Sequence, residues 1–311
     1  MHSNKLFLFF IAFCTYGFLS AQERETDFEL QAGLEQLLKD FEGTAGVYVY
    51  HLESNKQAGV NADTIFPTAS VVKVPILAGL FKKIEAGEYE LHEKMLYRDD
   101  RVYGGSGLMQ FYKDSTETNL RTLAALMITY SDNVTSLWSQ ELAGGGLQIN
   151  KFMEELGLKD TRVNSRTQGR EDIWEIYGWG QTTPREMSEL LLKIRNREVV
   201  SPRASDEMYR MLTNSFYTDY SLSQIPPYVQ TAAKQGMVNR SRSELVMVNA
   251  PSGDYVFYFA SKNAADTSWG YTNQAWELSR KVSAYLWKYF EPNSQWEPAE
   301  GAAQLVTGLP Y

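Results

Sequence analysis

Cysteine and histidine are scarce in this chain of 311 residues. Cys14 is the only cysteine, and the three histidines are His2, His51 and His92. A structural zinc site is therefore not expected, and a disulfide within one chain is excluded. A serine nucleophile would have to recruit His51 or His92 as its base, and neither lies in a segment typical of a catalytic histidine. We therefore expect any such serine to use a base that is not histidine.

Positive charge is also in short supply. The chain has 30 Lys and Arg against 38 Asp and Glu, a net charge of −8, and no basic stripe. Nucleic acid and an acidic membrane surface are therefore not expected as partners. Its 43% hydrophobic content suits a globular protein with a sizeable core. We expect a monomer with a small-molecule, peptide or ester substrate, and predict no metal and no cofactor.

The one long apolar run lies at the N-terminus, from Leu6 to Phe13. A lysine precedes it, and small residues follow at Ser20 and Ala21, a pattern typical of a secretory signal over residues 1–21. The run is too short to span a membrane comfortably. We therefore expect an exported protein, periplasmic or secreted, without a stable membrane anchor. A lipoprotein signal at Cys14 is the alternative, but it would need small neighbours.

Secondary-structure signals follow a simple order. Residues 26–41 read as a helix that opens with a capping box at Thr26–Glu29, and residues 45–66 read as a hairpin. Helical patterns dominate from residue 70 to about 212, with a Thr-Pro-x-Glu helix start at Thr183–Glu186. Strand patterns return at 228–233, 244–249 and 255–260, and a last helix ends before Pro292.

This order predicts an α+β fold of two lobes. Five antiparallel strands would form one sheet, flanked by the N- and C-terminal helices, with an all-helical lobe beside it. Residues 22–67 and 213–292 would form the α/β lobe, residues 68–212 the helical lobe, and residues 293–311 a C-terminal tail. A cleft between two lobes is a common place for an active site.

One lysine lies within an unusually apolar stretch of the sequence. Lys73 follows Val71 and Val72, and a charge among such neighbours is costly unless it has a function. Ser70 is three residues earlier, so on a helix the two side chains share a face. A lysine in a dry cleft has a lowered pKa and can act as a base. The alternative is a solvent-facing lysine behind a capping serine.

Two further stretches accompany this pair, Ser131-Asp-Asn133 after an apolar helix and Lys234-Gln-Gly236 at the end of a strand. With Ser70-Val-Val-Lys73 they appear in the order and spacing of the serine β-lactamase and penicillin-binding protein superfamily. The chain resembles the class A β-lactamase branch in particular, over roughly residues 26–290. Thr182-Thr-Pro184 extends the resemblance.

The resemblance implies roles for these residues. Ser70 would be the acylated nucleophile, Lys73 its base or proton shuttle, and Ser131 the proton donor to the leaving nitrogen. Asn133 would hold the substrate's side-chain amide, while Asp132 would be structural. The substrate carboxylate would face Lys234, in the same segment as Gln235 and Gly236. The backbone N–H groups of Ser70 and Met237 would form an oxyanion hole.

The chain departs from the family at the deacylating glutamate. Counting back from Pro184 places Thr167 at that position and Glu171 four residues later. Glu171 is our candidate for the replacement base, with a solvated carboxylate as the alternative and Glu175 as a further candidate. A site without such a base can stall as the acyl-enzyme.

Two substrate contacts differ as well. Gln235 stands where the family has Thr or Ser, and its longer side chain would narrow the pocket. Arg242 is the nearest candidate for the family's arginine on the next strand, and Arg240 is a second one. Either arginine can instead be a turn residue.

Three functions remain open at this stage. The first is an exported serine hydrolase of the β-lactamase type, acylated at Ser70, that hydrolyses the β-lactam amide bond with doubtful efficiency. The second is a D,D-peptidase, amidase or esterase with the same nucleophile. The third is a non-turnover β-lactam sensor whose acyl-enzyme persists.

Overall fold

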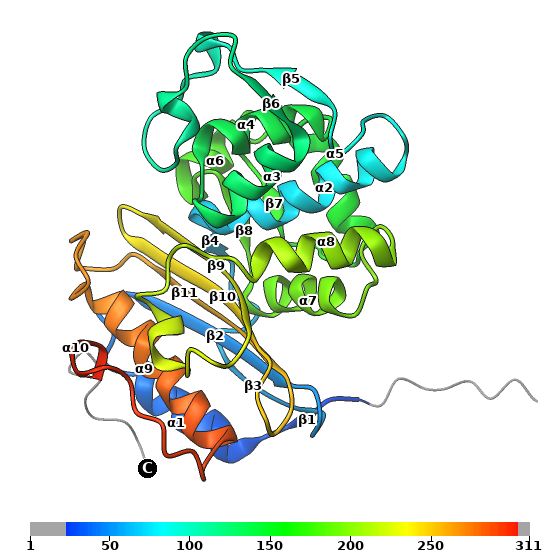
Figure 1. Cartoon of the computed structure of the whole chain (residues 1–311). Helices are drawn as coiled ribbons and strands as arrows, with labels where there is room; N and C mark the ends of the chain where they lie inside the picture. Colours follow the sequence, from blue (N-terminus) through cyan, green and yellow to red (C-terminus); the bar gives the residue numbers. More distant parts are fainter. Residues whose placement is uncertain (1–22, 304–311) are drawn as a thin grey trace, which may run out of the picture.

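The computed structural model describes residues 23–303. The predicted signal at 1–21 lies outside them, as does the end of the predicted tail. Two parts are evident in Figure 1, a sheet with α1 and α9 on its outer face and a helix-rich part on the other side. No helix of the described chain is long and apolar enough to cross a membrane.

The main sheet has six strands in the order β1-β3-β2-β11-β10-β9. Their bounds are β1 Glu25–Thr26, β2 Thr44–His51, β3 Lys56–Val60, β9 Thr231–Val238, β10 Ser241–Val248 and β11 Tyr255–Lys262. All five expected antiparallel strands are present, but the sheet has six strands, so the predicted number was wrong. The two-residue β1 adds a sixth strand, which runs parallel to β3. It is too short to show an alternating pattern, so the sequence carried no signal for it.

Helix α1 (Phe28–Leu38) begins one residue later than the predicted capping box requires. Its N-cap is Asp27, whose Oδ1 accepts a hydrogen bond from the Leu30 N–H at 3.2 Å. Thr26 cannot cap the helix because it belongs to β1. Here pairing with β3 determines where the helix begins.

The two faces of the sheet contact different layers. Along β11, Tyr255, Phe257 and Phe259 pack with α1 and α9 (Gln274–Phe290), while Val256 and Tyr258 point toward the helical part. This is the period of two expected for a strand buried on both faces. The described part of the predicted tail also packs here, since Trp296 lies against the outer layer.

The remaining elements lie mostly in the helix-rich part. They are β4 Phe66–Pro67, η1 Ala69–Val72, α2 Lys73–Glu85, β5 Lys94–Leu96, η2 Asp99–Arg101, η3 Met109–Phe111, β6 Glu117–Asn119, α3 Leu120–Thr129, α4 Asn133–Leu142, α5 Gly145–Glu155, β7 Arg162–Val163, α6 Glu171–Tyr177, β8 Gly180–Thr182, α7 Pro184–Arg195, α8 Pro202–Leu212, η4 Ser221–Gln224 and α10 Glu300–Ala303. The predicted start of α7 is confirmed, because Thr183 caps it through the Glu186 N–H.

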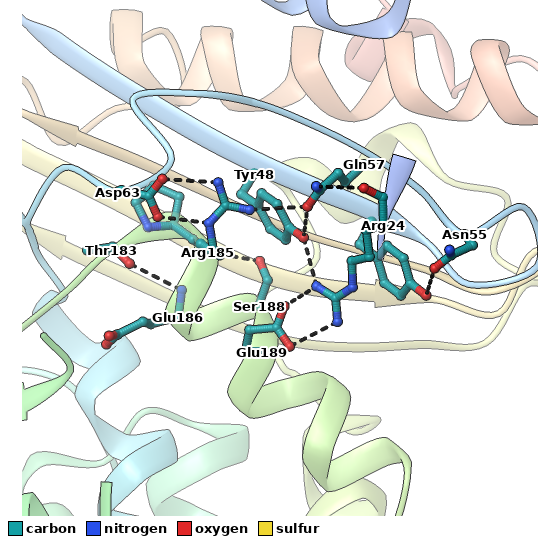
Figure 2. A network of polar contacts seen from close by, with 12 residues as sticks. Arg24, Tyr48, Asn55, Gln57, Asp63, Thr183, Arg185, Glu186, Ser188 and Glu189 are labelled. Atoms are coloured by element: carbon teal, nitrogen blue, oxygen red, sulfur yellow. Dashed lines mark hydrogen bonds and ion pairs between the residues drawn. The ribbon is translucent and has the colours of Figure 1, made fainter. Parts of the chain in front are cut away.

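Helix α7 lies between the two parts, against β2 and β11. Figure 2 shows the polar network that holds it there. Arg185 forms a bidentate ion pair with Asp63, and Arg24 pairs with Glu189 and hydrogen-bonds the Tyr48 hydroxyl at 2.8 Å. The network ties the first described residues and the sheet to α7.

Candidate active site

Ser70 lies in the short helix η1, at the base of the helical part. The segment before it is held on two sides. The Thr68 N–H donates to the Gly180 carbonyl at 2.9 Å, and the Thr68 carbonyl accepts from the Ser243 hydroxyl at 2.9 Å. The next residue, Ala69, has a φ of 44°, in the left-handed region that a residue with a Cβ adopts only at a cost. The backbone at Ser70 is therefore fixed by its surroundings.

Lys73 is the first residue of α2, and its side chain is fully buried. Its Nζ lies 3.0 Å from the Ser70 Oγ, as the spacing of three predicts. It also lies 3.1 Å from the Ser131 Oγ and 2.9 Å from the Asn133 Oδ1. No carboxylate forms an ion pair with this amine among residues 23–303.

The turn that carries Ser131 and Asn133 is positioned by Asp132. This buried carboxylate caps α4 through the Thr135 N–H at 2.9 Å and accepts from the Leu108 and Met109 N–H groups at 2.6 and 2.7 Å. All of these contacts are to backbone groups. Asp132 thus has the structural position that the family resemblance implied.

Lys234, on strand β9, also contacts Ser131. Its Nζ lies 2.9 Å from the Ser131 Oγ, so this hydroxyl is within hydrogen-bond distance of two lysine amines. The side chain of Gln235 folds back, and its Oε1 accepts from Lys234 at 3.0 Å. Lys234, like Lys73, is fully buried.

Burial lowers the pKa of both lysines. It lowers the pKa of Lys73 to about 7, although the negative charge of Asp132 opposes this shift. Burial also lowers the pKa of Lys234 well below its ordinary value, and the neighbouring Lys73 lowers it further. A substantial fraction of Lys73 is therefore neutral near pH 7 and able to accept a proton.

Gly236 occupies a position where a side chain does not fit. A Cβ there would lie 2.5 Å from the Thr68 carbonyl oxygen and 2.8 Å from the Ser70 nitrogen. This close approach brings the backbone of β9 against Ser70. Met237, the next residue along the strand, lines a cavity that also contains Ser70. The backbone N–H groups of Ser70 and Met237 are thus on neighbouring segments.

A cavity of about 530 Å³ opens over Ser70. Its walls are mainly hydroxyl, amide and aromatic groups, and no described Asp or Glu lines it. The lining residues are Ala69, Ser70, Tyr103, Gly105, Ser106, Ser131, Asn133, Trp179, Tyr217, Gln235, Gly236, Met237, Val238 and Trp269.

Glu171 lies in a different place. It lines a second cavity, of about 650 Å³, that shares Tyr103 and Trp179 with the first. The two shared rings meet edge to face at 5.5 Å, and the Trp179 ring centre is 5.8 Å from the Lys73 Nζ. Thr167 also lines the second cavity, and its hydroxyl donates to the Ser165 carbonyl at 3.0 Å. The predicted catalytic residues are therefore brought together except for Glu171.

The candidate arginines bind loops. Arg242 is buried and donates to the carbonyls of residues 238, 239, 241 and 268, at 2.6 to 3.2 Å. It does not line the cavity of Ser70, although its guanidinium lies 5.2 Å from the ring centre of Trp269, which does. Arg240 donates to the carbonyls of residues 263 and 264.

Sequence reasoning missed Trp179. Its position between two glycines, shortly before Thr182-Thr-Pro184, was a usable signal for a large side chain on a tight turn. Among the residues that the structure describes, no group of three or more His, Cys, Asp and Glu side chains is arranged to hold a metal.

Comparison with known proteins gives a consistent picture. The model of the beta-lactamase enzyme family (Beta-lactamase2) matches residues 29–290. Beta-lactamase VEB-1 of Pseudomonas aeruginosa is 21% identical over 244 residues, which are 75% of this chain and 81% of that protein.

Solved structures agree with this match. PBP-A is 28% identical with a TM-score of 0.77, and a PBP-A variant is known as an acyl-enzyme complex with penicillin G; each comparison covers 86% of this chain and 98% of the other. A beta-lactamase from Sphaerobacter thermophilus DSM 20745 is 20% identical with a TM-score of 0.75, over the same shares. The chain belongs to the beta-lactamase enzyme family, within the class A-like serine hydrolase superfamily.

Proposed function

We propose that this protein is an exported, monomeric serine hydrolase that is acylated at Ser70 by β-lactams and hydrolyses their amide bond. The observation that carries the proposal is the position of the Lys73 amine, within hydrogen-bond distance of both the Ser70 and the Ser131 hydroxyls. Its lowered pKa supports a base role near neutral pH.

In the acylation step, the Ser70 oxygen attacks the β-lactam carbonyl carbon and its proton passes to the Lys73 nitrogen. The backbone N–H groups of Ser70 and Met237 stabilise the oxyanion, where one lost donor costs about 3–4 kcal/mol of transition-state stabilisation. As the C–N bond breaks, Ser131 gives its proton to the leaving nitrogen and regains one from Lys73. Asn133 holds the substrate amide, and Lys234 and Gln235 face its carboxylate.

Deacylation needs a water molecule that attacks the ester and a base that accepts its proton. Since no Asp or Glu among residues 23–303 lines the cavity of Ser70, we infer that this step is slower than acylation and that the acyl-enzyme accumulates. Glu171 remains the candidate base only if the wall formed by Trp179 and Tyr103 opens. Glu171→Gln then retains the initial burst and abolishes steady turnover, and an unchanged steady rate removes Glu171 from the mechanism.

The test is intact-mass spectrometry after incubation with a penicillin. A single adduct is expected on the wild-type protein and none on Ser70→Ala. Ser106→Ala is the matched control, because Ser106 lines the same cavity but bonds to the Tyr130 carbonyl. A folded wild-type protein that stays unmodified would refute the proposal.

A second candidate function is a D,D-peptidase or esterase with the same nucleophile. It is favoured by the likeness to PBP-A and by the lining of the Ser70 cavity, to which no carboxylate of the described part of the chain contributes. Turnover of a chromogenic cephalosporin, compared with that of D-alanyl-D-alanine peptides and nitrophenyl esters, separates the two. One equivalent of product followed by no further reaction would identify a β-lactam sensor.

A further inference from the structure

We infer that Trp269 is a specificity-determining residue of the Ser70 cavity and that Arg242 is the positioning residue that fixes it there. Together they select substrates whose acyl side chain carries an uncharged aromatic group. Both roles rest on the proposed acylation of Ser70 and specify its substrate class. Arg242 then acts through Trp269 and not by contact with the substrate.

Trp269 lies at the mouth of the cavity. It lines the cavity over Ser70, and its side chain is still 62% exposed. The centre of its ring lies 5.2 Å from the Arg242 guanidinium. The indole therefore offers the rest of its aromatic surface to a group that enters the cavity. Removing such surface from water is favourable, and contact with a second ring adds to the gain.

Arg242 fixes the residue directly before this indole. Its side chain is buried, with an exposed fraction of 1%. Nη1 donates to the carbonyls of residues 238, 239 and 241, and Nη2 donates to the Ser268 carbonyl at 2.6 Å. One planar guanidinium thereby joins the turn between β9 and β10 to the loop that carries Trp269.

The start of α9 holds the same segment from another direction. The Ser268 carbonyl also accepts from the Asn273 Nδ2 at 3.0 Å, and the Ser268 N–H donates to the Asp266 Oδ1 at 2.8 Å. Asn273 is the N-cap of α9. Arg242 differs from these two partners because it also lies against the indole ring. Loss of the guanidinium would therefore remove a contact from both Ser268 and Trp269.

The position of Trp269 matches one end of a bound β-lactam. Lys234, which faces the substrate carboxylate in the proposed function, precedes Val238 on β9 by four residues, or about 13 Å of extended strand. Val238 also lines the cavity, and its carbonyl is one of the groups that Arg242 holds. Trp269 therefore lies toward the Val238 end. The carboxylate and the acyl side chain of a penicillin extend from opposite ends of its fused rings, so the acyl side chain reaches this end.

The guanidinium beside the indole determines which group it favours. A cation already lies against this ring, so a second cation nearby is repelled. No Asp or Glu of residues 23–303 lines the Ser70 cavity to offset that repulsion. An uncharged aromatic group meets no such cost and gains the contact between rings. The favoured acyl side chain is therefore of the phenyl type.

The test compares two penicillins that differ only in the acyl side chain, benzylpenicillin and 6-acetamidopenicillanic acid. Stopped-flow acylation gives the dissociation constant of the first complex and the acylation rate constant separately. In the wild-type protein, the phenyl group should lower the dissociation constant about tenfold, which corresponds to about 1.4 kcal/mol. Trp269→Ala should bring the ratio of the two constants close to one, whereas Trp269→Phe should keep most of it. Trp174→Ala, at an exposed tryptophan that lines only the second cavity, should keep the wild-type ratio.

Arg242→Lys tests the positioning role, because a lysine keeps the charge but cannot bond the turn and Ser268 in the same fork. The ratio should fall about threefold, through the dissociation constant and not through the acylation rate constant. Arg240→Lys is the matched control, since Arg240 donates to the carbonyls of residues 263 and 264 and leaves Ser268 held.

The outcomes separate this inference from the proposed function. Equal dissociation constants for the two penicillins, or an unchanged ratio in Trp269→Ala, would overturn the role of Trp269 while acylation of Ser70 still stands. An equal fall in Arg240→Lys, or a fall in the acylation rate constant alone, would overturn the role of Arg242. Failure of both penicillins to acylate the wild-type protein would overturn both proposals.

Discussion

The two cavities lie side by side but hold complementary chemistry. The one over Ser70 gathers hydroxyl groups in contact with two buried lysine amines, and no described carboxylate lines it. The second cavity has Glu171 and Glu175 in its lining, and no described lysine lines it. In the proposed reaction, the groups that form the ester are thus separated by Trp179 and Tyr103 from the groups that could activate water. We therefore expect that acylation and release can be altered independently.

The largest effect is expected for the amine of the first cavity. Lys73→Met removes the base while keeping an apolar chain of similar length, and the acylation rate constant should fall about 10³-fold. Stopped-flow measurement of β-lactam acylation checks this. Lys83→Met, on the same helix but in a surface ion pair with Glu88, should acylate at the wild-type rate. Equal rates for Lys73→Met and wild type would remove Lys73 from the mechanism.

The next largest effect is the pH dependence of acylation. Because burial lowers the pKa of Lys73 to about 7, its neutral form is the minority below that pH and the majority above it. The acylation rate should therefore rise about tenfold per pH unit up to pH 7, and level off above it. Single-turnover rates from pH 5 to 9 measure this limb. A rise centred near the ordinary lysine pKa would contradict the lowered value.

A smaller effect is expected when the two cavities are joined. Trp179→Ala removes part of the wall and should shorten the lifetime of the acyl-enzyme about tenfold, because the carboxylate of Glu171 gains access to the ester through water. The lifetime is followed by intact mass. Trp179→Phe retains an aromatic wall and should keep the long lifetime. If the double variant Trp179→Ala, Glu171→Gln deacylates as fast as the single variant, water access alone explains the change.

The smallest effect on turnover is expected for Thr167→Glu, the change that restores the family's residue by sequence count. Thr167 is 5% exposed and lines the second cavity. Its side chain also packs closely against α5, because a Cβ on Gly146 would clash with the Thr167 hydroxyl. A longer side chain at position 167 therefore has no space on that side. We expect no faster deacylation and a loss of about 2 kcal/mol of stability. Thermal unfolding and acyl-enzyme lifetime are measured together. Gln168→Glu, at an exposed neighbour, should unfold like wild type, and rapid deacylation by Thr167→Glu would place that carboxylate near Ser70.

Local patterns predicted the elements of this fold well, because their causes are local. The alternation along β11 and the Thr183 cap follow from side-chain direction and from unpaired backbone donors, both visible in a few residues. The spacing of Ser70 and Lys73 likewise placed their side chains in contact. The motif at Ser131 could be matched to that pair only by resemblance to a family, since long-range packing brings the two together.

The features that the sequence did not predict share a different origin. The position of Glu171 depends on the path of the chain through Trp179 and on how α6 packs, which no count from Pro184 contains. Arg242 donates to three carbonyls of the residues just before it and to the carbonyl of Ser268, and this last contact is set by tertiary structure. The sixth strand is only two residues long, so its pairing with β3 left no periodic signal.

The positive φ of Ala69 has a practical consequence for engineering. An L-residue held there stores about 1–3 kcal/mol of backbone strain directly before Ser70, the proposed nucleophile, and the surrounding contacts of residues 68 and 236 keep it in place. A glycine at this position would adopt the same angle without that strain, but would also let the turn relax into others. We therefore expect a glycine at position 69 to raise thermostability and to lower the precision with which Ser70 is positioned. Selection for heat tolerance alone would then tend to reduce activity.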